Sequence, residues 1–238
     1  MKKVSIPAMN PEHNYDIEIF MPDQENWMPD APDRKLWPVV WLHSFAGEGE
    51  KIWKLSNRNF ILLCVTGMDW NRDLSPWPAA RVFSSGEDFG GNAKAYMQYF
   101  TEMVIPRVEG LLDSPVSIRG IVGYSMAGLF AAYAVYHSSL FSFMGTMSGS
   151  LWFDDWQEYA LSHKPAGSLR KIYVSLGSKE HRTKNPRMAR VRQCTDTLAK
   201  YWRSYGEVLY EINPGGHFNQ PEARVARGID WLAERNHY

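Results

Sequence analysis

The chain has 238 residues, of which 45% are hydrophobic and 14% aromatic, and its 26 Lys and Arg residues balance 26 Asp and Glu residues. With a formal net charge of zero, the protein has no long-range field that would attract nucleic acid or an acidic membrane surface, so neither is expected as a partner. The length fits one large α/β domain over residues 1–238 better than two small domains.

Cysteine usage and apolar runs indicate the cellular compartment that the sequence predicts. Two cysteines, Cys64 and Cys194, imply no disulfide framework. No apolar run approaches the roughly 20 residues that span a bilayer, and no apolar signal segment follows the N-terminal lysines. The sequence therefore predicts a cytoplasmic protein with no membrane partner, and it leaves the oligomeric state open.

The predicted elements alternate between strands and helices. Strands are predicted over 15–22, 38–43, 59–67, 117–125, 143–150, 170–178 and 208–214. Helices are predicted over 92–106, 126–137, 185–206 and 221–235. Such alternation implies the α/β class, with a mostly parallel sheet and helices on both faces. Ligands of these sheets collect at the carboxyl ends of the strands.

Three segments of the N-terminal half carry more detailed expectations. The proline-rich stretch 21–38 predicts a long loop between strands. The long irregular stretch 69–92 is expected to form one wall of an active-site cleft, because loops of this length are often functional. The helix over 92–106 is predicted to have Asn92 as its N-cap and to stop at Pro106. Its expected buried face consists of Tyr96, Phe100 and Met103.

Ser125 lies between a predicted buried strand and a predicted buried helix. Small residues surround it, namely Gly123, Ala127 and Gly128, as a sharp strand-to-helix turn requires. Such a turn exposes the serine hydroxyl and places the Met126 N–H at a helix N-terminus, where it can donate to an oxyanion. The sequence therefore predicts a nucleophile at Ser125; the alternative is a serine that only caps the helix.

His217 follows the last predicted strand, behind two glycines that let its loop come close to Ser125. This position suits a general base, and the alternative is a solvent-exposed loop histidine. Glu180, just past the strand over 170–178, is the predicted acid that orients the imidazole, although it could instead join a surface salt-bridge cluster. Asp154 and Asp155 are the reserve candidates for the acid.

The second oxyanion donor is expected in the loop after the strand over 38–43. The N–H of Phe45 is the first choice there and Ser44 the second. His43, at the strand end, is expected to be buried and hydrogen-bonded to backbone.

Ten tryptophans are a heavy load for this length. Four of them fall on loops predicted at the carboxyl edge of the sheet: Trp53, Trp70, Trp77 and Trp152. Trp53, Trp77 and Trp152, with Ser44, are candidate pocket residues for an aromatic acyl or alcohol group. The alternative is that these tryptophans pack the long loops onto the domain.

Several segments resemble the putative-esterase branch of the α/β-hydrolases, which includes S-formylglutathione hydrolase, feruloyl esterases and the siderophore trilactone esterases. They are 39–53, 69–78, 86–109, 123–136, 147–153, 175–191 and 213–232. The likeness to the siderophore esterases is the strongest and extends from about residue 15 onward. It implies the α/β-hydrolase fold, with the nucleophile at Ser125, the base at His217 and oxyanion donors at Phe45 and Met126. The fifth position of the G-x-S-x-G elbow is Ala127 here instead of glycine.

These expectations combine into a serine esterase that acts on a small-molecule carboxylic ester. No metal-ligand spacing, phosphate loop or dinucleotide fingerprint occurs, so neither a metal nor an organic cofactor is expected. An acyltransferase with the same triad and a ligand-binding scaffold without turnover are the two alternatives.

Overall fold

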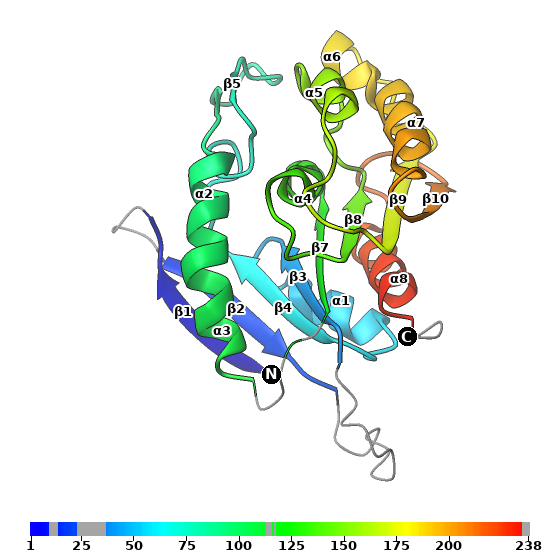
Figure 1. The fold of residues 1–238 in the computed structure, drawn as a ribbon. Helices are drawn as coiled ribbons and strands as arrows, with labels where there is room; N and C mark the ends of the chain where they lie inside the picture. Colours follow the sequence, from blue (N-terminus) through cyan, green and yellow to red (C-terminus); the bar gives the residue numbers. More distant parts are fainter. Residues whose placement is uncertain (10–13, 23–36, 113–115, 117, 235–238) are drawn as a thin grey trace.

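The computed structural model describes residues 1–9, 14–22, 37–112, 116 and 118–234. Its centre is an eight-stranded sheet in the order β1-β2-β4-β3-β7-β8-β9-β10 (Figure 1). The strands are β1 (Lys2–Pro7), β2 (Asn14–Phe20), β3 (Val39–His43), β4 (Ile61–Thr66), β7 (Arg119–Tyr124), β8 (Phe143–Met147), β9 (Lys171–Gly177) and β10 (Glu207–Asn213). All seven predicted strands are thus present.

The direction of the strands defines one functional edge. β2 is antiparallel to both β1 and β4, whereas the neighbours from β4 to β10 run parallel. The carboxyl ends of six strands therefore meet at one edge of the sheet. β1 was not predicted, because its two lysines and its terminal proline mark a largely exposed edge strand with little hydrophobic pattern.

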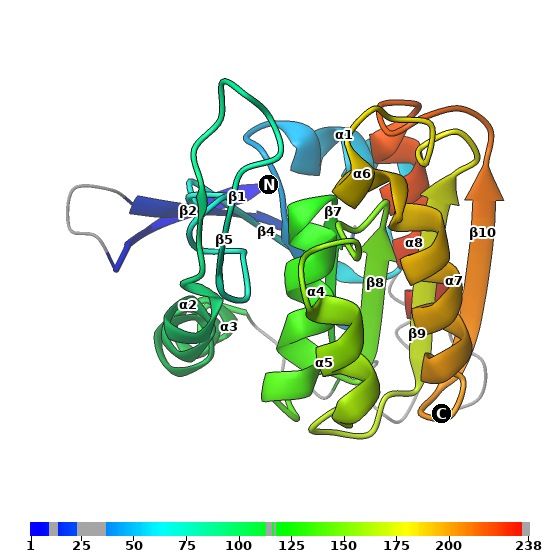
Figure 2. The ribbon, with the colours of Figure 1, turned by 90° about the horizontal axis from the view of Figure 1, so that it is seen from above.

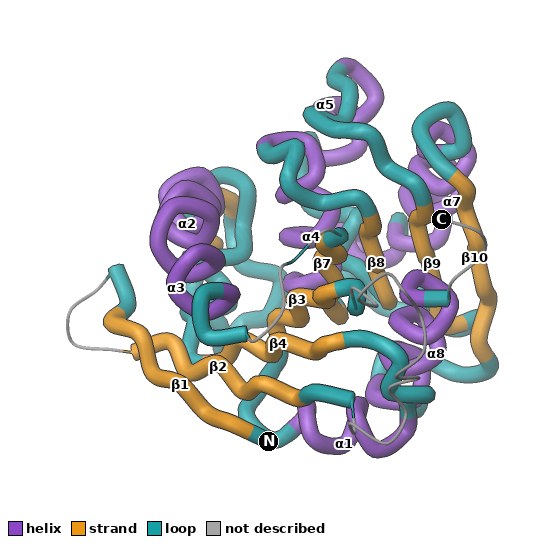
Figure 3. The backbone as a smooth tube through the Cα atoms, turned by 60° about the horizontal axis from the view of Figure 1, so that its bottom comes forward, coloured by secondary structure: helices purple, strands orange, loops and turns teal. Residues whose placement is uncertain are grey.

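Helices cover both faces of this sheet (Figures 2 and 3). One face carries α2 (Ala93–Tyr99), α4 (Met126–His137), α5 (Trp156–Ser162) and α7 (Val191–Trp202), and the other carries α1 (Glu48–Leu55) and α8 (Pro221–Ala233). Every residue of α4 from Met126 to Tyr136 is buried, which explains why its sequence is apolar all round. The helix that follows Ser125 is therefore held rigidly between the sheet and the outer helices.

The predicted helix over 92–106 differs in three ways. Asn92 makes no side-chain cap, and the helix passes through a π-helical turn, η2 (Phe100–Val104), into α3 (Ile105–Glu109). Pro106 does not stop the helix and lies in the first turn of α3, directly after the π turn. The extra residue in the π turn moves Val104 into the core and leaves Met103 52% exposed.

Three further differences concern short elements. The predicted helix over 185–206 is split into α6 (Pro186–Ala189) and α7, and neither α1 nor α5 was predicted. The stretch 69–92 contains a small antiparallel pair, β5 (Pro78–Ala79) with β6 (Phe89–Gly90). The proline-rich loop predicted over 21–38 lies mostly outside the described residues. In the described part of the chain, no helix has both the length and the apolar character needed to cross a membrane.

The π turn predicts unequal effects on stability for two adjacent substitutions. Val104→Ala removes buried methyl groups and is expected to lower the free energy of unfolding by about 2 kcal/mol. Met103→Ala changes an exposed side chain and is expected to change it by less than about 0.5 kcal/mol. Urea unfolding of both variants measures the difference. A larger loss at Met103 than at Val104 would show that the face continues with α-helical spacing.

Candidate active site

Ser125 lies on the turn between β7 and α4 with a strained backbone, at φ 57° and ψ −121°. Three backbone hydrogen bonds hold it there. Its N–H donates to the Met147 carbonyl at 3.1 Å, and its own carbonyl accepts from the N–H groups of Leu129 at 3.1 Å and Ser150 at 3.0 Å. A positive φ at a non-glycine residue persists only where the surroundings fix it, and such strain is typical of functional sites.

The small residues around Ser125 provide the space for this turn. A Cβ on Gly123 would lie 2.3 Å from the backbone of Ala127, and a Cβ on Gly128 would lie 3.0 Å from both the Gly123 carbonyl and Gly149. Ala127 itself is completely buried. The elbow therefore forms with alanine at its fifth position, as expected.

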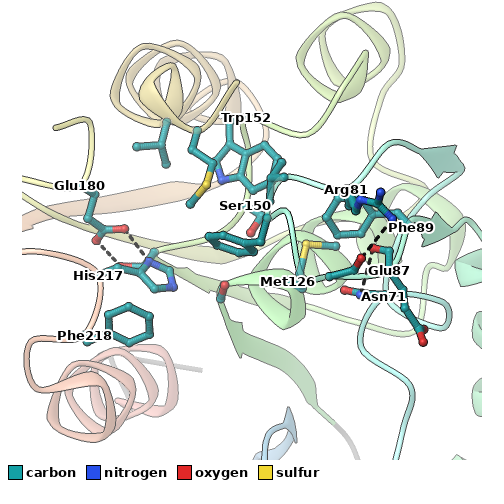
Figure 4. A pocket seen from close by; sticks show the side chains of 17 residues that line it. Asn71, Arg81, Glu87, Phe89, Met126, Ser150, Trp152, Glu180, His217 and Phe218 are labelled. Atoms are coloured by element: carbon teal, nitrogen blue, oxygen red, sulfur yellow. Dashed lines mark hydrogen bonds and ion pairs between the residues drawn. The ribbon is translucent and has the colours of Figure 1, made fainter. Parts of the chain in front are cut away.

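The structure brings together His217 and Glu180. His217 Nδ1 lies 2.8 Å from Glu180 Oε2 (Figure 4). The side chain of Glu180 is only 3% exposed, whereas that of His217 is 31% exposed. Glu180 is thus no member of a surface salt-bridge cluster. Its anionic form favours the imidazole tautomer with the proton on Nδ1, which leaves Nε2 free to accept a proton.

The other oxygen of Glu180 is also engaged. Oε1 accepts from Ser148 Oγ and from the Gly177 N–H, both at 2.5 Å. Burial raises the pKa of Glu180, but the hydrogen bonds from His217, Ser148 and Gly177 outweigh burial and hold the pKa below its ordinary value. The carboxyl group is therefore ionised at neutral pH.

Backbone contacts join the loops of the acid and the base. The Lys179 N–H donates to the Gly215 carbonyl at 2.9 Å, and Tyr124 Oη donates to the carbonyl of His217. Gly215 has φ +94°, a conformation that a side chain would strain. These contacts fix the backbone on both sides of the imidazole.

The two expected oxyanion donors have different surroundings. Met126 opens α4, and the first N–H groups of a helix have no partner within the helix, so its N–H remains suited to an anion. The N–H of Phe45 donates to Glu48 Oε2 at 3.0 Å, so a substrate oxygen must displace this carboxylate to reach it. The second choice, Ser44, was wrong, because its N–H donates to the Val65 carbonyl in the sheet.

Ser125 and His217 both line a cavity of about 360 Å³. We call it the larger cavity, to distinguish it from a second cavity of about 210 Å³ that also reaches Ser125. The wall of the larger cavity includes Phe89, Met126, Ser150 and Trp152 (Figure 4). Met188 and Val191 also line it. Arg81, Val82, Phe83 and Glu87 of the 69–92 stretch also line it, which agrees with the wall expected from the sequence.

Only one of the candidate pocket tryptophans lines this cavity. That residue is Trp152. Trp53 stacks on Phe20 on the side of the sheet that α1 covers. Trp77 packs against Phe153 and the α5 helix, and its Nε1 donates to the Asp154 carbonyl. For Trp53 and Trp77, the alternative of loop packing is the correct one. Ser44 is buried and hydrogen-bonded to Cys64 Sγ, and it does not line the cavity.

The remaining candidates have structural roles. Asp154 pairs with Arg187 at 2.7 Å, and Asp155 is an exposed residue before α5, so neither replaces Glu180. His43 is buried, but its Nε2 bonds to the Tyr96 hydroxyl at 2.9 Å and not to backbone as expected. Burial lowers the pKa of His43 to about 3, so it stays neutral. The described residues hold no group of three or more His, Cys, Asp or Glu side chains arranged for a metal ion.

Sequence reasoning missed three side chains around Glu180: Tyr124, Ser148 and Arg224. Tyr124 and Ser148 end or follow buried strands at the functional edge, a position that could have drawn attention. Arg224 lies on the buried side of α8 beside Val225 and Ala226, and it is only 1% exposed. A charged residue on an apolar helix face was the signal available for it.

Comparisons with known proteins give a family match and a sequence relative. A family model described as "Putative esterase" matches residues 52–218. The chain is 28% identical over 176 residues to "Uncharacterized protein YbbA" of Bacillus subtilis (strain 168), a match that covers 69% of each protein.

Solved structures show the same fold at low sequence identity. An IroE-like serine hydrolase from Shewanella oneidensis matches with a TM-score of 0.76 and 16% identity, over 98% of this chain and 79% of that one. The siderophore hydrolase EstA from Aspergillus nidulans matches with a TM-score of 0.70 and 17% identity, over 98% and 93% of the two chains. The α/β-hydrolase fold predicted from the sequence is thereby confirmed.

The elbow predicts an asymmetry between two small residues. Gly123→Ala places a methyl group against the Ala127 backbone, which cannot move without breaking the turn, and is expected to lower the free energy of unfolding by about 3 kcal/mol or more. Ala127→Gly removes one buried methyl from the helix and is expected to cost about 1 kcal/mol. Thermal and urea unfolding compare the two variants, and equal losses would contradict the proposed packing.

Proposed function

This chain belongs to the family described as "Putative esterase", and from that premise we propose that it hydrolyses a small or medium carboxylic ester through an acyl-enzyme intermediate. The membership confirms an enzyme that acts on ester bonds, as predicted from the sequence, and a solved neighbour described as a serine hydrolase supports a serine nucleophile. The observation that carries the mechanism is the 2.8 Å contact between His217 Nδ1 and the buried Glu180 carboxylate, beside a serine on a strained turn.

In the proposed first half-reaction, Ser125 Oγ attacks the ester carbonyl carbon while His217 Nε2 takes its proton. The new oxyanion accepts from the Met126 N–H and, once Glu48 has moved aside, from the Phe45 N–H. The C–O bond to the alcohol then breaks, and the proton on His217 passes to the leaving alkoxide. Glu180 stabilises the imidazolium throughout and keeps its own charge.

In the second half-reaction, water takes the place of the alcohol. His217 accepts a proton from the water as the water oxygen attacks the acyl carbon. His217 then donates this proton to Ser125 Oγ as the carboxylic acid leaves. The neighbour described as a serine hydrolase supports the assignment of a serine nucleophile, and the one described as a siderophore hydrolase supports an ester or lactone as substrate.

Turnover of p-nitrophenyl butyrate tests the assignment of roles. Ser125→Ala and His217→Ala are expected to reduce kcat by about 10⁴-fold or more, and Glu180→Gln by about 10²- to 10⁴-fold. Asp155→Asn is the matched control, since it changes an exposed carboxylate to an amide on a neighbouring loop, and it is expected to keep full activity.

Two results would contradict the proposal. Folded Ser125→Ala protein with the turnover of the natural protein would remove Ser125 as the nucleophile. A loss in Asp155→Asn as large as that in Glu180→Gln would remove Glu180 as the acid of the site.

A further inference from the structure

A second cavity, of about 210 Å³, also reaches Ser125. We call it the smaller cavity, and its wall includes Phe45, Glu48, Ile52, Trp70, Glu222 and Val225. Ser125, His217 and Phe218 line both cavities. Phe218 is 90% exposed and packs edge-on against the His217 ring at 5.1 Å. The reactive serine therefore lies where two separate spaces meet, one for each side of an ester bond.

The larger cavity suits a bulky uncharged group. Phe89, Trp152 and Met126 give it an apolar wall. Apart from Glu180, which is paired with His217, its charged members are Arg81 and Glu87, exposed residues of the 69–92 stretch. Its volume falls in the range of pockets that enclose drug-sized ligands. Aromatic and aliphatic walls of this kind bind by removing apolar surface from water.

The smaller cavity differs in size and charge. The rings of Phe45 and Trp70 stack at 4.1 Å between centroids and form one wall. Two carboxylates face the space, and only Glu222 has a basic partner, Lys51 at 3.2 Å. Burial, together with the charge of Glu222, raises the pKa of Glu48. A negatively charged group placed here would meet the carboxylates of Glu48 and Glu222, of which Lys51 offsets the second.

We propose that the substrate is an ester with two unequal halves, a bulky uncharged group that fills the larger cavity and a compact group without negative charge that enters the smaller one. This inference rests on the proposed function and adds a substrate class to it. Contacts with both halves hold the carbonyl carbon against Ser125, so the bulky half raises kcat/KM by positioning as well as by binding.

Hydrolysis in a pH-stat tests the size requirement with four esters. Ethyl butyrate is compact on both sides, ethyl 4-phenylbutyrate and 4-phenylbutyl butyrate are bulky on one side, and 4-phenylbutyl 4-phenylbutyrate is bulky on both. The better of the two esters with one bulky half is expected to exceed ethyl butyrate in kcat/KM by about 30-fold, as burial of a phenyl ring implies. The kcat/KM of the ester with two bulky halves is expected not to exceed that of the better ester with one bulky half.

Two variants assign the effects to the cavities. Val82→Phe narrows the larger cavity and is expected to reduce kcat/KM about tenfold more for the better ester than for ethyl butyrate. Adding a carboxylate to the compact half of the better ester is expected to reduce its kcat/KM about tenfold. The Glu222→Gln variant is expected to recover part of this loss in kcat/KM. The exposed Glu102→Gln is the matched control and is expected to recover none.

The outcomes separate this inference from the proposed function. Equal kcat/KM for compact and bulky esters, an equal effect of Val82→Phe on both, or full acceptance of the carboxylate would overturn the two-cavity inference and leave the esterase intact. Failure to hydrolyse any ester would overturn both.

A second inference comes from the buried guanidinium of Arg224. Its Nη1 donates to the Tyr124 hydroxyl at 2.8 Å and lies 3.5 Å from Glu180 Oε1, and its Nη2 donates to Ser175 Oγ at 3.3 Å. Its Nε is buried and has no hydrogen-bond partner among the described residues. A charge buried at this cost is retained where it compensates another, and Glu180 is the anion beside it.

We infer that Arg224 is a positioning residue, which orients Glu180 toward His217 and offsets part of the carboxylate charge. Through Tyr124 it also supports the backbone carbonyl of His217. Two tyrosines are also coupled to Glu180, namely Tyr124 and Tyr210 of β10. Burial raises the pKa of both, so both are neutral at the pH of the reaction. Without the cation, the charge of Glu180 stabilises the imidazolium form of His217 more strongly. The acidic side of the pH profile is therefore expected to shift to higher pH.

The pH profile of kcat/KM distinguishes this role from a structural one. In Arg224→Met, the acidic limb is expected to move upward by about half a pH unit or more and kcat to fall, with KM for ethyl butyrate little changed. Arg224→Lys is expected to restore the limb but only part of kcat, because an ammonium lacks the fork that reaches both partners.

Unchanged kcat and an unchanged acidic limb in folded Arg224→Met protein would overturn this inference. If that variant does not fold, Tyr124→Phe and Arg224→Lys decide, and kcat values equal to that of the natural protein in both would overturn it as well.

Discussion

The buried carboxylate of Glu180 is the constraint on which the active site depends. An ionised group that is 3% exposed is stable only with donors around it. Here the donors come from different parts of the fold: Ser148 after β8, the N–H of Gly177 in β9, His217 after β10 and Arg224 in α8. The donors that stabilise the charge of Glu180 therefore fix the relative positions of three strand ends and one helix. The imidazole of His217 is oriented as a consequence.

The opposite side of the site depends on strain instead of charge. Ser125 is held at a positive φ by its hydrogen bonds to β8 and to α4, and α4 is itself enclosed on every side. Because neither the helix nor the strand can shift, the turn cannot relax, and the hydroxyl and the Met126 N–H keep their places. The exception is the hydrogen bond from the Phe45 N–H to Glu48, which would have to open for this N–H to bind a substrate oxygen as proposed.

The sequence was sufficient for what depends on local pattern. The apolar runs of β3, β4, β7, β8 and β9 and the small residues near Ser125 each predicted their element. The position of Glu180 just past a predicted strand suggested its pairing with His217. What it could not give depends on contacts between distant segments. The π turn before Pro106 and the stacking of Trp53 on Phe20 leave no periodic signal. The apolar helix face around Arg224 indicates that this side chain is buried, but not that it contacts Tyr124.

The central claim is that Ser125 is an activated nucleophile, and covalent labelling tests it most directly. The natural protein would be treated with a fluorophosphonate at pH 7 and the modified peptide identified by mass spectrometry. The account predicts one label per chain, on Ser125, and a much slower reaction when His217 is replaced by alanine. A folded protein that takes up no label, or that carries it on another residue, would contradict the account.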